Sequence, residues 1–212
     1  MQTFDRPAIK AEAKRLFYAN RSLCISMALL VVLANVLLTS ISAGFLAILL
    51  TGVISVTSAG FFLNIWRESP QAVSQAVSDT FDVNFLRKMG GMLWMMLKVF
   101  LWSLLFMIPG IIKAFAYALT PYILYDCPNV PAMEACRISE KITRGHKGEL
   151  FVAYLSFLGW DLLGVLTLGI LEVLFVLPYK ETTFAGIYEE LKQLALDTGA
   201  VTQAELDGQV MV

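Results

Sequence analysis

The sequence predicts an all-α fold, a polytopic membrane helical bundle with amphipathic helices at the membrane interface. Of the 212 residues, 58% are hydrophobic and only 16% are charged, whereas soluble domains carry about 25% charged residues. The stretch from Ser22 to Trp66 holds 45 residues and not one charged side chain. These observations argue against a soluble, disordered or fibrous chain. The net charge of −1 gives no reason to expect a nucleic-acid partner.

The N-terminal residues 1–21 carry five basic and two acidic side chains and predict a cytoplasmic amphipathic helix. Its residues Lys10, Lys14 and Arg15 are candidate contacts with anionic lipid, at about 1 kcal/mol for each basic residue near the surface. A plain orientation signal ahead of the first span is the alternative, and the sequence does not separate the two.

The uncharged stretch must fold back inside the membrane. As one helix it would measure roughly 68 Å, more than twice the hydrocarbon core of about 30 Å. A reversal at Ser42–Gly44 gives predicted spans at about 22–42 and 45–66. In the second span, small residues recur at every fourth position and predict a helix-packing ridge; a pore-lining face of Thr and Ser is the alternative. The ridge consists of Ala43, Ala47, Thr51, Ser55 and Ala59.

The next apolar block is also too long for one span. A polar cytoplasmic loop, 67–88, precedes it, and Pro109-Gly110 is a strong turn signal that divides it into predicted spans at about 89–108 and 111–125.

The second cytoplasmic loop, 126–149, predicts an amphipathic helix over 132–145. Its basic side suits anionic headgroups, and a solvated basic face is the alternative. The candidate lipid contacts here are Arg137, Lys141, Arg144 and Lys147.

The last apolar block predicts a third reversal at Thr167-Leu168-Gly169. Spans at about 150–166 and 170–188 complete a membrane domain over 22–188 with six spans in three hairpins. One long tilted span over the block, giving five in total, is the alternative. An acidic cytoplasmic tail, 189–212, follows.

The basic residues support this arrangement. In the six-span plan, 14 of the 16 lysines and arginines fall on the cytoplasmic side and none in the external turns, which is the positive-inside pattern. The N-terminus is therefore predicted in the cytoplasm, and the C-terminus on the same side.

Several ordered motifs between Leu101 and Tyr188 resemble a bacterial integral membrane family known as domain of unknown function 975. They include Ile108-Pro109-Gly110-Ile111-Ile112-Lys113, Thr120-Pro121-Tyr122-Ile123-Leu124, Asp126 with Pro128, Gly145-His146-Lys147, Thr167-Leu168-Gly169-Ile170, Pro178-Tyr179 and Tyr188-Glu189-Glu190-Leu191. The resemblance implies a multi-pass protein of the bacterial plasma (inner) membrane and implies no activity.

Four ionisable residues of the predicted spans are candidate functional residues: Lys98, Lys113, Asp161 and Glu172. A charge at the bilayer centre costs at least about 2.5–3.5 kcal/mol, so each needs a partner or water. We hypothesise that Lys98 pairs with Asp161 and Lys113 with Glu172. Asp161 and Glu172 stand where the resemblance implies apolar residues.

The sequence shows no hydrolase or nucleotide-binding motif, and no catalytic, cofactor or metal site is predicted. The expected function is therefore non-enzymatic, as a scaffold, accessory or envelope-maintenance protein. Expected partners are the lipid bilayer, anionic lipids, and another membrane protein or a second copy of the chain. The alternative is a small-solute or ion transporter or channel with a polar pathway around Lys98.

Overall fold

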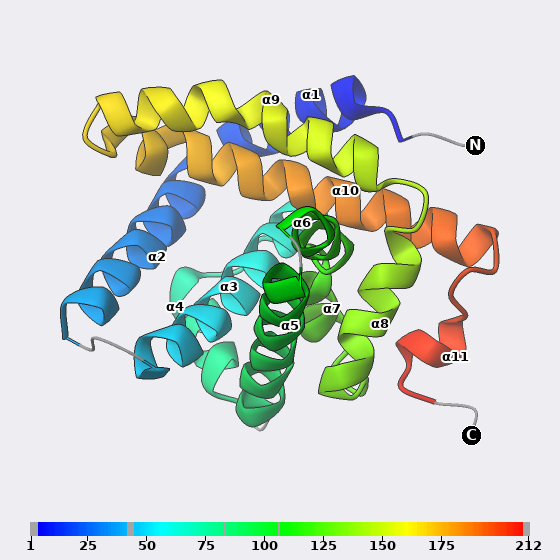
Figure 1. Cartoon of the computed structure of the whole chain (residues 1–212). Coiled ribbons are helices and arrows are strands. Elements are labelled where there is room, and N and C mark those ends of the chain that lie inside the picture. The colour runs from blue at the N-terminus through cyan, green and yellow to red at the C-terminus, as the bar shows by residue number, and fades with distance from the viewer. Residues whose placement is uncertain (1–3, 42–44, 83, 106, 210–212) are drawn as a thin grey trace.

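The computed structural model describes residues 4–41, 45–82, 84–105 and 107–209, and every regular element within those ranges is a helix (Figure 1). The predicted all-α fold class is therefore confirmed for the described residues. In chain order the elements are α1 (Arg6–Ala19), α2 (Arg21–Ile41), α3 (Phe45–Trp66), α4 (Val73–Ser78), the 3-10 turn η1 (Asp79–Phe81), α5 (Phe85–Leu105), α6 (Met107–Ala116), α7 (Thr120–Asp126), α8 (Ala132–Ile142), α9 (Lys147–Leu166), the π-helical η2 (Glu172–Val176), α10 (Leu177–Asp197) and α11 (Gln203–Leu206).

Three helices, α1, α9 and α10, form a layer across one end of the molecule (Figure 1). Helices α2, α3, α5 and α8 extend away from this layer. The central element is α3, which contacts α2, α5, α7 and α10. Its side chains Phe61, Phe62, Leu63 and Ile65 are fully buried and form the middle of the main apolar core.

The N-terminal helix has the local signals and the buried face that its sequence predicts. The Asp5 side chain accepts a hydrogen bond from the backbone N–H of Ala8, and Pro7 lies in the first turn. Ile9, Ala13 and Leu16 are buried on one face, and the helix packs against α10. Its apolar face therefore meets protein.

The predicted turn at Pro109-Gly110 is wrong. Both residues lie inside α6, which begins at Met107. A Cβ on Gly110 would come within 2.8 Å of Ser103 Cα, so the glycine lets α5 and α6 pack closely. Pro109 is the third residue of α6, where a missing N–H costs no helical hydrogen bond.

The predicted span over 111–125 is interrupted. The backbone leaves the helix at Tyr117–Leu119 and resumes as α7 at Thr120. Pro121 explains the break, because it has no N–H to donate to the carbonyl four residues earlier. In the first turn of α7 the proline costs no helical hydrogen bond, because the N–H groups there have no partner within the helix.

The third reversal is where the sequence predicts it. Leu168 and Gly169 have φ values of 55° and 84°, and the Gly169 N–H donates to the Gly164 carbonyl at 2.9 Å, which closes α9. The returning chain remains helical through Pro178, because the π-helical turn of η2 lies just before it. One long helix over the whole block, the five-span alternative, does not form.

Three helical stretches are long and apolar enough to cross a membrane: Arg21–Leu38, Ile108–Asp126 and Lys147–Leu166. A shorter apolar stretch, Leu50–Trp66, lies in α3. Helix α10 contains the charged residues Lys180, Glu181, Glu189 and Glu190, which lower its hydropathy. The described residues thus contain three candidate spans where the sequence predicted six.

Candidate functional site

A partly polar cavity of about 180 Å³ lies between α2, α3, α7, α9 and α10. Seven of its lining residues carry polar side chains and come from all five helices, although the surrounding core is apolar. They are Asn35, Ser55, Ser58, Tyr122, Tyr154, Lys180 and Glu181; Val31, Ile54, Ala59, Ala118, Pro121 and Phe184 complete the lining. We call this space the Glu181 cavity.

The two charged residues of the Glu181 cavity differ in their ion pairing. The Lys180 ammonium lies 2.9 Å and 3.1 Å from the two carboxylate oxygens of Asp161, which is on α9. Tyr122 and Glu181 line the cavity together. Across the described part of the chain, Glu181 forms no ion pair.

Aromatic rings form one wall of the Glu181 cavity. The ring centroids of Tyr154 and Phe184 lie 4.1 Å apart. On the far side of Tyr122, the Tyr188 ring stacks on it with centroids 5.4 Å apart and an interplanar angle of 17°. Tyr188 is fully buried, so this stack holds the Tyr122 ring in place at the cavity.

Asp126 joins three elements beneath this wall. Its side chain is only 8% exposed and lies 2.6 Å from the Arg67 guanidinium and 2.6 Å from the Lys192 ammonium. The Tyr188 hydroxyl donates to the same carboxylate at 2.8 Å. Since these groups come from the ends of α3 and α7 and from α10, Asp126 is a positioning residue for the aromatic stack.

The ion pairs hypothesised from the sequence are wrong. Lys113 lies 2.6 Å from Glu140 of α8, and Asp161 pairs with Lys180. The physical reason is tertiary packing, in which α6 lies against α9 and η2, just before α10, lies against α9. Sequence spacing fixes neither contact.

Lys98 lies over two aromatic rings, 5.3 Å from the Trp94 centroid and 5.4 Å from that of Tyr117, and it does not line the Glu181 cavity. The Glu172 carboxylate lies against Gly164 of α9. A Cβ added at Gly164 would come within 2.5 Å of that carboxylate.

Several candidate lipid contacts meet protein groups. Lys10 donates to Ser156 at 2.6 Å and lies over the Phe157 ring; burial, with the neighbouring Arg6 charge, lowers the pKa of Lys10. Arg15 pairs with Glu12 and Glu68, and Arg137 and Lys141 pair with acidic residues, among them Glu205. Lys14 and Arg144 are exposed, and Lys147 is half-buried.

Part of the predicted packing ridge faces the Glu181 cavity. Ser55 and Ala59 line it, while Thr51 is half-buried and its carbonyl accepts a hydrogen bond from the Ser55 hydroxyl. Ala43 lies outside the described residues, as does the side chain of Ala47. Close packing of α3 instead involves the neighbouring glycines, Gly52 against Met92 and Gly60 against Tyr125.

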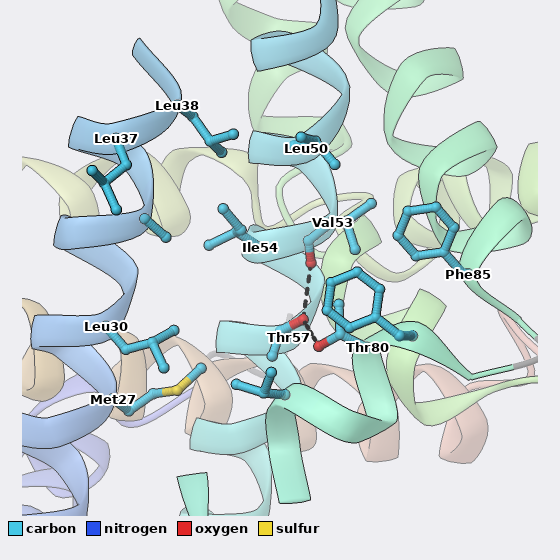
Figure 2. A pocket seen from close by; sticks show the side chains of 13 residues that line it. Met27, Leu30, Leu37, Leu38, Leu50, Val53, Ile54, Thr57, Thr80 and Phe85 are labelled. Atoms are coloured by element: carbon cyan, nitrogen blue, oxygen red, sulfur yellow. Dashed lines mark hydrogen bonds between the residues drawn. The ribbon is translucent and has the colours of Figure 1, made fainter. Parts of the chain in front are cut away.

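A second, apolar cavity of about 350 Å³ lies between α2, α3, η1 and the start of α5 (Figure 2). Figure 2 shows leucine and isoleucine side chains around it and the hydroxyls of Thr57 and Thr80 hydrogen-bonded to each other at 2.5 Å. Thr57 also donates to the Val53 carbonyl. Because both hydroxyls are occupied, this cavity offers an occupant mainly apolar contact.

Sequence reasoning missed Glu181 and Tyr154. The signal was present, because the polar run Lys180–Thr183 interrupts an otherwise apolar predicted span. Within the part of the chain that the structure describes, no three His, Cys, Asp or Glu side chains gather as metal ligands, and Cys24, Cys127 and Cys136 are free thiols.

The fold and the cavity define an all-helical protein with three helices able to cross a membrane and a polar cavity among its helices. The model of the family described as protein of unknown function (DUF975) matches residues 104–195. This segment of the chain therefore matches that family, as its motifs predict, and it contains α6 to α9 and most of α10, including Tyr122, Tyr154 and Glu181. Searches among curated proteins and among solved structures gave no match.

Proposed function

We propose that this protein is a non-enzymatic, multi-pass protein of the bacterial plasma (inner) membrane. It acts there as a scaffold, accessory or envelope-maintenance component through contacts with lipid and with other membrane proteins or a second copy of the chain. The observation that carries the proposal is the exposed surface of α9.

Helix α9 exposes large apolar side chains along one face. Leu155, Leu158 and Leu162 are 51%, 60% and 62% exposed, and Leu166 is 72% exposed. The opposite face, with Ala153 and Phe157, is buried against protein. Soluble monomers rarely expose contiguous apolar patches of more than a few hundred Å², so this face is typical of one that meets lipid or a membrane partner.

Contacts among segments predicted to be cytoplasmic support the proposed topology, in which both termini lie in the cytoplasm. Arg15 of the N-terminal segment pairs with Glu68 of the first loop, and the Asp5 N–H donates to Glu190 of the C-terminal segment at 3.4 Å. Arg87 at the end of the first loop donates to the carbonyls of Cys127 and Val130 in the second. Segments that contact one another in this way can share one side of a membrane.

The proposal is tested by placing a charge on the exposed face of α9. Leu162→Lys raises the cost of membrane insertion by about 3–4 kcal/mol, so we expect the membrane-bound fraction after alkaline carbonate extraction to fall sharply. Gln203→Lys, on the exposed α11, is the matched control and leaves that fraction unchanged. Equal behaviour of the two variants contradicts the proposal.

The second candidate function is small-solute or ion transport, and the Glu181 cavity is the observation that favours it. The pathway hypothesised around Lys98 has less support, because Lys98 contacts aromatic rings away from the cavity. Co-purification of one stable partner from native membranes favours the scaffold. Solute-dependent flux into liposomes that contain only this protein favours transport.

A further inference from the structure

We infer that the Glu181 cavity binds a small organic monocation, such as an amine or a quaternary ammonium group, with Glu181 as the counter-ion. This site is separate from the apolar surface of α9 on which the proposed function rests. The inference depends on the charge balance, the aromatic wall and the size of the cavity.

The charge balance leaves one negative charge in the cavity. The ionisable groups that face it are Lys180 and Glu181, with Asp161 behind Lys180. The Lys180 ammonium contacts both oxygens of Asp161, so that pair is neutral as a unit. Glu181 has no ion-pair partner in the described residues. An unpaired carboxylate among membrane helices is costly, and a bound cation removes the cost.

The aromatic wall favours an organic cation over a metal ion. Tyr122, Tyr154 and Phe184 line the cavity together with Glu181, and an ammonium group within about 6 Å of aromatic faces gains about 0.5–2 kcal/mol. A metal ion instead prefers several oxygen ligands at short range, and the cavity offers one carboxylate. An anion would be repelled by Glu181.

The volume limits the ligand. A cavity of about 150 Å³ admits benzene, with six non-hydrogen atoms. The Glu181 cavity of about 180 Å³ therefore admits an ion of about seven non-hydrogen atoms. Ser58 and Tyr154 line the same space, and their hydroxyl groups can donate hydrogen bonds to a polar substituent of the ligand or accept them from it.

The test uses choline and its uncharged carbon analogue, 3,3-dimethyl-1-butanol, which has the same shape. Each is titrated calorimetrically into the full chain in lipid nanodiscs. We expect choline to bind with a Kd tighter than about 1 mM, and the uncharged analogue to bind at least about tenfold more weakly, because it lacks the attraction to Glu181.

The variant Glu181→Gln keeps the size of the side chain and removes its charge. We expect it to weaken choline binding at least about tenfold and to leave binding of the uncharged analogue unchanged. Glu190→Gln, an exposed position on the same helix, is the matched control and leaves choline binding unchanged.

Three results overturn the inference: no choline binding to the wild-type chain, equal binding of choline and its uncharged analogue, or displacement of choline by an equal concentration of potassium ions. If Glu181→Gln does not fold, the comparison of choline with its analogue on the wild-type chain still decides the question.

Discussion

Gly60 is the position where α3 approaches the Tyr125 ring most closely. A Cβ at this position would fall well inside 3.0 Å of the ring, so Gly60→Ala must displace Tyr125. The displacement breaks the hydrogen bond that Asn64 donates to the Tyr125 hydroxyl at 2.9 Å. Overpacking costs about 1–3 kcal/mol and the hydrogen bond about 0.5–1.5 kcal/mol, while alanine gains about 1 kcal/mol in helix propensity. We expect a net loss of about 1–3 kcal/mol.

The measurement is unfolding in detergent micelles, followed by tryptophan fluorescence. Gly90→Ala is the control, because a Cβ at Gly90 in α5 meets no atom within 4 Å, and we expect it to be neutral or stabilising by up to about 1 kcal/mol. In the background of Tyr125→Leu the cost of Gly60→Ala should shrink, which a double-mutant cycle measures. If Gly60→Ala proves as stable as Gly90→Ala, the packing of α3 against α7 is not as described.

Three further outcomes are expected. Asp126→Asn removes the charge shared by Arg67 and Lys192 and should destabilise the protein by about 2–4 kcal/mol; unchanged thermal unfolding would refute the positioning role of Asp126. Lys98→Met should lower stability by less than about 1 kcal/mol, because it loses only contacts with aromatic rings; loss of the folded protein would show that the charge has a further partner. The hydrogen bond from Lys141 holds the pKa of Glu205 below its usual value of 4.5. The pair therefore stabilises the folded protein above about pH 4.5, and this stabilisation is lost as pH falls through the lowered pKa. A carbon-13 NMR titration of Glu205, with Lys141→Met as the comparison, measures the shift, and identical titrations in the two proteins would contradict it.

The sequence predicted those helices whose boundaries or buried faces depend on neighbouring residues in the chain. The predicted range 45–66 coincides with α3, because its apolar run is bounded by polar or small residues at both ends. The reversal at Thr167-Leu168-Gly169 was predictable because a glycine that can adopt a positive φ follows an apolar helix. The helix over 132–145 was predictable from its buried stripe, in which Ala135, Ile138 and Ile142 are buried.

Tertiary packing determined the features that the sequence did not predict. Pro109-Gly110 has the composition of a turn, yet both residues lie inside α6, where Gly110 packs closely against Ser103 of α5. The partners of Lys113 and Asp161 depend on how α8 and α10 return along the bundle. The Glu181 cavity is assembled from five helices, and no spacing within one segment indicates it.

The exposed face of α9 gives the most direct test that this chain is embedded in a membrane. A spin label is attached at Leu158→Cys, and at Gln203→Cys as the control, in a variant in which Cys24, Cys127 and Cys136 are replaced. In lipid vesicles we expect the label at position 158 to collide often with dissolved oxygen and rarely with a water-soluble nickel chelate, and the label at position 203 to show the reverse. If the chelate reaches position 158 as readily as position 203, α9 faces water and a membrane location is contradicted.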